Sequence, residues 1–141
     1  MGNRVTIKKI GFEDVQHAIK QGRGNYLLIS TLHLGDQGCL IQGTVSAHDE
    51  EALINKHLRK TGITIIVYGK NSTDESIFKK YEQLLTLGFT NIYVYTGGMF
   101  QWLLLQDMYG KEEFQTTNDE LDVLKYRPAV LLTRKLLQDI D

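Results

Sequence analysis

The chain has 141 residues, 42% hydrophobic and 23% charged, which suits one domain with a substantial core and an ordinary globular composition. Its 16 basic and 17 acidic side chains give a net charge of -1, so no basic excess points to nucleic acid or to an anionic membrane surface. The single cysteine, Cys39, excludes an internal disulfide and a cysteine-based zinc cluster, and no apolar run is long enough to span a membrane.

The N-terminal residues allow two interpretations. They lack the apolar stretch of a secretory signal, which together with the single cysteine predicts a cytoplasmic protein. Residues 1–6, MGNRVT, fit the short M-G-x-x-x-[ST] pattern for myristoylation at Gly2. Chance matches to this pattern are common, and Val5, Thr6 and Ile7 alternate as at the start of a strand, so we keep both alternatives open.

Apolar runs alternate with amphipathic segments over most of the chain. The runs at 26–30, 63–68 and 91–95 are apolar at most positions, as is typical of strands buried on both faces of a sheet. In chain order, the predicted elements are a strand at 5–10, a helix at 13–21, a strand at 26–30, a helix at 49–59, a strand at 63–68, a helix from Thr73 to a stop at Gly88, a strand at 91–95 and a helix at 99–108. This alternation predicts an α/β fold, with a mostly parallel central sheet and helices on both faces.

Helix starts and inner faces are predicted from residue spacing. Ser46 with Asp49, and Ser72 with Glu75, have the spacing of capping pairs. The predicted inner faces hold Leu53, Ile54 and Leu58 in the helix at 49–59, and Ile77, Tyr81, Leu84 and Leu85 in the next helix. Near the C-terminus, Asn118 is a candidate cap for a short helix that carries Leu121 and Leu124. Pro128, the only proline, fits the first turn of a last helix at 129–140.

Several short motifs occur in an order and spacing that together point to one family. GFTNIY at 88–93 is similar to a Gly-Phe-x-Asn-Val-Tyr strand entry, and Gly97-Gly98 followed by Trp102 is similar to a closing Gly-Gly…Trp. CLIQGT at 39–44 falls where a Gly-His-Ile-Pro-Gly-Ala motif would lie and keeps its isoleucine and second glycine. With these motifs, the chain resembles the rhodanese-like domain family.

The resemblance implies an overall organisation. The whole chain, residues 1–141, would be a single rhodanese-like domain with the shared core at about 5–108 and a C-terminal helical extension at about 111–141. It implies thiosulfate sulfurtransferase as the family activity. We can assign no activity to the extension.

The catalytic loop is where the chain departs from the family pattern. Family members carry sulfur on a cysteine just after the strand at 63–68, and the matching residue here is Gly69, which has no nucleophile. A loop arginine normally helps to bind the oxyanion, whereas Asp74 and Glu75 occupy that region and would repel an incoming anion. Lys70 returns one positive charge. The loop length is nearer that of the related dual-specificity phosphatases, which need the same cysteine.

The predicted site is therefore a degenerate loop without catalytic residues: Gly69, Lys70, Asn71, Ser72, Thr73, Asp74 and Glu75. From a helix start at Thr73, we expect weak affinity for sulfate or phosphate, which Asp74→Asn with Glu75→Gln should strengthen. Ser72 and Thr73 are alternative nucleophiles, but a helix cap explains Ser72 more simply.

Other candidate site residues are the cysteine and the histidines. Cys39 is a candidate nucleophile or, more simply, a small buried residue. No histidine pair has metal-ligand spacing with a third ligand nearby, so we predict no metal site and no cofactor. His17 and His57 are expected in solvent, and His33 is a candidate to face the pocket.

Two hypotheses about function remain open. The first is a catalytically inactive rhodanese-like domain that acts as a protein-binding or regulatory module, with another protein as its partner. The second is a sulfurtransferase or phosphatase relative that uses a non-standard nucleophile such as Cys39. The intact scaffold around a missing nucleophile favours the first.

Overall fold

The computed structural model describes residues 6–22, 24–58 and 62–132. Within them, a four-stranded parallel sheet has the order β1-β4-β3-β2. The strands are β1 (Lys9–Ile10), β2 (Tyr26–Ser30), β3 (Thr64–Tyr68) and β4 (Ile92–Tyr95). The strand that leads into the degenerate loop, β3, is an interior strand, as predicted. No helix in the described part of the chain is long and apolar enough to cross a membrane.

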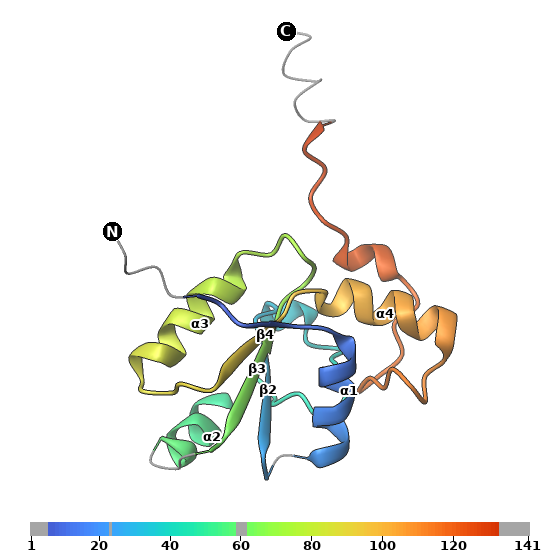
Figure 1. Ribbon diagram of the computed structural model, residues 1–141. Helices are drawn as coiled ribbons and strands as arrows, with labels where there is room; N and C mark the ends of the chain where they lie inside the picture. The colour runs from blue at the N-terminus through green and yellow to red at the C-terminus, as the bar shows by residue number, and fades with distance from the viewer. Residues whose placement is uncertain (1–5, 23, 59–61, 133–141) are drawn as a thin grey trace, which may run out of the picture.

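Four α-helices cover the two faces of the sheet (Figure 1). They are α1 (Phe12–Gln21), α2 (Glu50–His57), α3 (Ser76–Thr86) and α4 (Gly98–Tyr109). One core contains residues of α1 and α4, and the other contains residues of α2 and α3. The predicted α/β fold, a parallel sheet with helices on both faces, is confirmed.

The strands serve both cores because successive side chains point to opposite faces. In β3, Ile66 and Tyr68 belong to the core with α1 and α4, while Ile65 and Val67 belong to the core with α2 and α3. All four of these side chains are at most 2% exposed. This two-sided burial explains why the strand is apolar along its length instead of alternating.

Two predicted details of the first half are wrong. The first strand is only Lys9–Ile10, because these two residues alone pair with β4, at Val94 and Tyr95. In α2, His57 is buried and Leu58 is 42% exposed, the reverse of the prediction. The buried face of the helix holds Ile54 and His57, and Leu58 follows as the C-cap. The predicted Ser46–Asp49 pair does form, since the Asp49 N–H lies 3.2 Å from Ser46 Oγ, but it lies in the turn before α2, whose N-cap Asp49 makes no side-chain capping bond.

Residues 111–132 contain less helix than predicted. Their one complete regular element is the 3-10 helix η2 (Val123–Tyr126); 129–131 are not helical, and Leu132 is the first helical residue after η2. The remainder of the predicted last helix, from residue 133, lies outside the described residues, as does Gly2. Backbone groups of this segment bond to distant backbone: the Gln42 N–H donates to the Gln115 carbonyl at 3.0 Å, and the Thr117 N–H to the Leu40 carbonyl at 2.8 Å. These tertiary hydrogen bonds attach residues 115–117 to residues 40–42.

Candidate functional site

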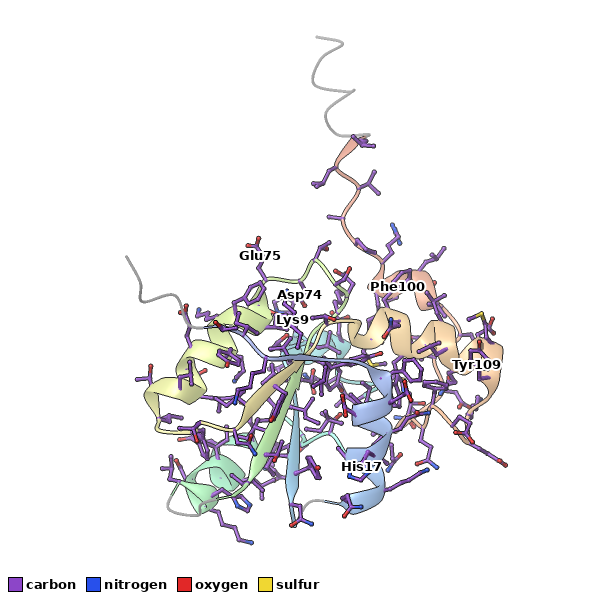
Figure 2. All side chains as sticks on the ribbon, in the orientation of Figure 1. Lys9, His17, Asp74, Glu75, Phe100 and Tyr109 are labelled. Carbon is purple, nitrogen blue, oxygen red and sulfur yellow. The ribbon has the colours of Figure 1, made fainter. Side chains whose placement is uncertain are left out.

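The loop at 69–75 runs from the carboxyl end of β3 to the start of α3. In parallel α/β sheets, binding sites lie at the carboxyl ends of the strands. Figure 2 shows Asp74 and Glu75 at this end of the sheet. An open groove of about 970 Å³ lies against the loop. Its walls are the loop itself, residues 31–33 and Asp36 after β2, and residues 125–130 near the C-terminus. The histidine predicted to face the pocket, His33, lines this groove.

Gly69 is buried, and the space next to it is filled by a carboxylate. A Cβ atom added to Gly69 would lie 2.5 Å from Asp74 Oδ2, 2.9 Å from Asp74 Cγ and 3.0 Å from Thr31 Oγ1. No side chain fits at this position unless Asp74 moves. The place of the missing nucleophile is thus occupied by an acidic side chain of the same loop.

The Asp74 carboxylate is held by donors on both of its oxygens. The Lys70 N–H donates to Oδ2 at 2.8 Å, and the Ser76 N–H donates to Oδ1 at 3.0 Å. The Ser76 hydroxyl lies 2.7 Å from Oδ1 and 2.7 Å from Thr31 Oγ1. Partial burial raises the pKa of the Asp74 carboxyl, but the hydrogen bonds from Lys70 and Ser76 outweigh this effect, and the pKa lies below its ordinary value. The carboxylate is therefore the stable form.

This arrangement corrects the predicted start of the helix. Helix α3 begins at Ser76 rather than Thr73, and Glu75 at its N-cap makes no side-chain capping bond. Asp74 satisfies the first helical N–H instead, because its carboxylate reaches the amide two residues ahead. The predicted Ser72–Glu75 cap does not form, and Ser72 is exposed at the surface of the loop.

Asn71 connects the loop to the C-terminal segment. Its side chain is 6% exposed, and Nδ2 donates to the Tyr126 carbonyl at 2.9 Å. Oδ1 accepts from the Thr73 N–H at 3.0 Å and from the Thr73 hydroxyl at 2.7 Å. Tyr126 is fully buried, so this contact fixes the outer wall of the groove to the loop.

The loop also holds the start of α4. The Gly69 carbonyl accepts from the Met99 N–H at 3.0 Å, and the Lys70 carbonyl accepts from the Phe100 N–H at 2.9 Å. Gly98 has φ 64°, and a Cβ there would lie 2.6 Å from the Gly69 carbonyl oxygen. The predicted Gly97-Gly98 turn thus allows the helix to pack directly on the loop.

The charges that line the groove are mixed. Lys70, the one cation of the loop, lies 3.8 Å from Asp36, and Lys125 lies 3.2 Å from Glu120. Arg127 donates from Nη1 to the Leu124 carbonyl at 2.8 Å and has no carboxylate partner among the described residues. The loop side of the groove therefore carries Asp74 and Glu75 beside one cation, Lys70, while the C-terminal side carries the basic Lys125 and Arg127.

The family is decided by sequence. The model of the rhodanese-like domain family matches residues 36–105, the stretch that includes the loop and the start of α4. The chain belongs to the rhodanese-like domain family. No curated protein matches it.

Solved structures share the fold of this rhodanese-like chain. The BH2092 protein of Bacillus halodurans superposes with a TM-score of 0.59 at 16% identity, over 92% of this chain and 89% of that one. The rhodanese-like domain of the Anabaena sp. Alr3790 protein gives 0.55 at 16% identity, over 89% and 88%. Ygr203w, a yeast protein tyrosine phosphatase of the rhodanese family, gives 0.55 at 14% identity, over 88% and 100%. At these identities the likeness shows the fold alone.

Cys39, the only thiol of this rhodanese-like domain, does not line the groove. It is 4% exposed, and its Sγ lies 3.2 Å from the Asn118 carbonyl oxygen. Burial raises the pKa of the thiol, so the thiolate form is disfavoured. This position agrees with the interpretation of Cys39 as a small buried residue. In the described parts of the chain, no three His, Cys, Asp or Glu side chains lie where they could hold a metal ion.

Two contributors to the rhodanese-like site have no local signal in the sequence. Asn71 and Tyr126 are 55 positions apart, and nothing in either segment indicates that they meet. The role of Asp74 was predicted only as electrostatic repulsion of an anion. Its direct occupation of the space beside Gly69 depends on the loop conformation, which spacing alone does not give.

Proposed function

We propose that this chain is a non-catalytic rhodanese-like domain that binds another protein and acts as a regulatory or adaptor module. The observation that carries the proposal is the Asp74 carboxylate packed against Gly69, in the space that a nucleophilic side chain would need.

Two features of the loop argue against group transfer. Gly69 supplies no nucleophile, and the Lys70 and Ser76 N–H groups that would hold an oxyanion are used by Asp74. Asp74 is itself a poor nucleophile, because both of its oxygens accept hydrogen bonds and its pKa is lowered. Use of Cys39 instead finds little support, since the thiol is buried away from the groove.

The groove supports a polypeptide partner rather than a small molecule. Small-molecule sites are mostly enclosed and apolar with a few polar groups. This groove is open, and its walls carry Asp36, Lys70, Glu75 and Arg127. Exposed charges of both signs favour a partner with complementary charges along an extended surface.

Absence of chemistry is tested with two assays on the full chain, thiosulfate-to-cyanide sulfur transfer and hydrolysis of an aryl phosphate. Turnover should equal that of buffer, and Cys39→Ser should change nothing. Turnover that disappears in Cys39→Ser would establish the alternative nucleophile and overturn the proposal.

Protein binding is tested by co-purification of the full chain from its own cells, beside Arg127→Glu and Lys56→Glu. Arg127 lines the groove, whereas Lys56 is an exposed cation on α2 and does not. A partner recovered with the unmodified protein should be lost from Arg127→Glu and kept by Lys56→Glu. Equal recovery with both variants, or no partner at all, would count against the groove as a binding surface.

A further inference from the structure

We propose that Asp74 is a stopper of the loop, a side chain whose carboxylate occupies the position that an incoming anion would take and so blocks anion binding. The inference deepens the proposed function and rests on it in one respect, that Gly69 marks a vacated nucleophile position. It adds a prediction that the absence of a nucleophile alone does not make. The loop should remain competent to hold an oxyanion and should be blocked by one removable side chain.

The first argument is occupancy. Asp74 Oδ2 would lie 2.5 Å from a Cβ at Gly69, so the carboxylate fills the bottom of the space that a side chain at 69 and its bound group would share. Glu75, the next acidic residue, is exposed and makes no such contact. The blocking effect is therefore specific to Asp74 and is not shared by the acidic pair.

The second argument is the use of donors. Three donors converge on one carboxylate: the Lys70 N–H, the Ser76 N–H and the Ser76 hydroxyl. Hydrogen bonds to an ionised acceptor are stronger than neutral ones. An external anion would have to displace all three and also approach a fixed negative charge. Unmodified protein should consequently show no saturable binding of sulfate or phosphate.

The third argument is that the loop has supports independent of Asp74. The Gly69 and Lys70 carbonyls hold the start of α4, and Asn71 holds the Tyr126 carbonyl. The Lys70–Asp36 pair supports the loop from the side of the groove. Removal of the carboxylate should leave the Lys70 and Ser76 amides close to their present positions. The vacated space would then present donors without an acceptor.

The test is titration of full-length protein with sulfate, read from the amide signals of Lys70 and Ser76 in nitrogen-15 correlation spectra. Asp74→Ala removes both the charge and the bulk, Asp74→Asn removes the charge alone, and Glu75→Gln is the matched control. We expect no saturable shift for the unmodified protein or for Glu75→Gln. Asp74→Ala should give a saturable shift confined to the loop, at least tenfold tighter than any binding by the unmodified protein, with Asp74→Asn in between.

Two outcomes of the sulfate titration would contradict the proposal. Equal sulfate binding by Asp74→Ala and the unmodified protein would overturn it, and so would a gain in Glu75→Gln as large as that in Asp74→Ala. If Asp74→Ala does not fold, Asp74→Asn keeps the same shape and decides the question alone. In that case, a saturable shift of the loop signals in Asp74→Asn that the unmodified protein does not show would support the proposal. The absence of such a shift in Asp74→Asn would overturn it.

A thiol placed at position 69 gives a second readout. In Gly69→Cys, the added side chain meets the Asp74 carboxylate, which should disfavour the thiolate. In Gly69→Cys with Asp74→Ala, the freed amides should stabilise it. The rate of alkylation by uncharged iodoacetamide, followed against pH in a Cys39→Ser background, should rise at lower pH in the second protein than in the first. Coincident pH profiles would overturn the proposal. Sulfur transfer by the unmodified protein would instead refute the proposed function and leave these loop measurements standing.

Discussion

At the scale of single residues, the charge on Asp74 should link stability to pH. Its hydrogen bonds lower the pKa in the folded protein relative to an unfolded carboxyl, whose pKa is about 3.9. The stabilisation is then fully present above the unfolded pKa and is lost as the pH falls through the folded pKa. The positive charge of Lys70 also favours the charged form of the Asp74 carboxyl.

The prediction concerns the difference in melting temperature between the unmodified protein and Asp74→Asn. That difference should be constant from neutral pH to about pH 5 and should shrink as the pH falls further, because protonation removes the advantage of the carboxylate. Thermal unfolding at a series of pH values measures it, and Glu75→Gln, which disturbs no hydrogen bond to the loop, is the control. A difference that does not depend on pH would show that the charge of Asp74 plays no part in holding the loop.

The residues of the loop also show how far sequence reasoning reaches. The absence of a nucleophile at Gly69 could be predicted from the matching motifs, because the sequence itself gives the residue type at each position. The cap on α3 was predicted at Ser72 and found at Asp74, because both side chains are good acceptors and the choice depends on the turn made by 69–75. Residue spacing therefore predicts candidate capping residues, and the backbone conformation of the loop determines which of them caps the helix.

At the scale of elements, the C-terminal segment should contribute strongly to stability although it is largely irregular. Phe114 is 3% exposed, and its ring centroid lies 5.1 Å from that of Trp102 and 5.5 Å from that of Phe12. Phe114→Ala should lower the free energy of unfolding by about 3–5 kcal/mol, as is usual for a buried aromatic side chain. Phe78, on α3, is 39% exposed, so Phe78→Ala should cost much less.

Urea denaturation of the two variants measures both effects. Similar losses of stability in Phe114→Ala and Phe78→Ala would mean that the segment after α4 does not share the core. The segment was predicted as helical because Asn118 suits a cap for a short helix that carries Leu121 and Leu124, and Pro128 fits the first turn of a last helix. Both leucines are exposed instead, and the buried residues are Phe114 and Tyr126, whose spacing has no period. The alternating strands and helices, by contrast, were predictable because their apolar residues repeat with the element itself.

At the scale of the whole molecule, the two cores should unfold together, since β3 and β4 supply side chains to both. Leu84, fully buried on α3, lies in one core, and Trp102, the only tryptophan, lies in the other. Leu84→Ala should lower the free energy of unfolding by about 2–5 kcal/mol. The midpoint seen by Trp102 fluorescence should move as far as that seen by far-ultraviolet circular dichroism.

Leu104, which is 42% exposed on α4, supplies the control variant Leu104→Ala. A fluorescence midpoint that stays in place while the dichroism midpoint moves would reveal two independently unfolding halves. The sheet that joins these cores was predicted from the order of the elements. The groove was predicted only at the loop and at His33, because its other wall comes from residues 125–130, far along the chain from the loop that they face.

The two walls of the groove differ in what holds them. The loop wall is tied to β3, α3 and α4, whereas the opposite wall is fixed by Tyr126 and continues as residues 127–131, which are largely exposed and have no regular structure (Figure 1). Residues 127–131 can therefore change in sequence or length at little cost to folding. The groove therefore combines a loop wall that the fold holds in place with a C-terminal wall that can vary. New binding preferences can arise in the C-terminal wall while the scaffold, and the loop that no longer needs a nucleophile, stay as they are.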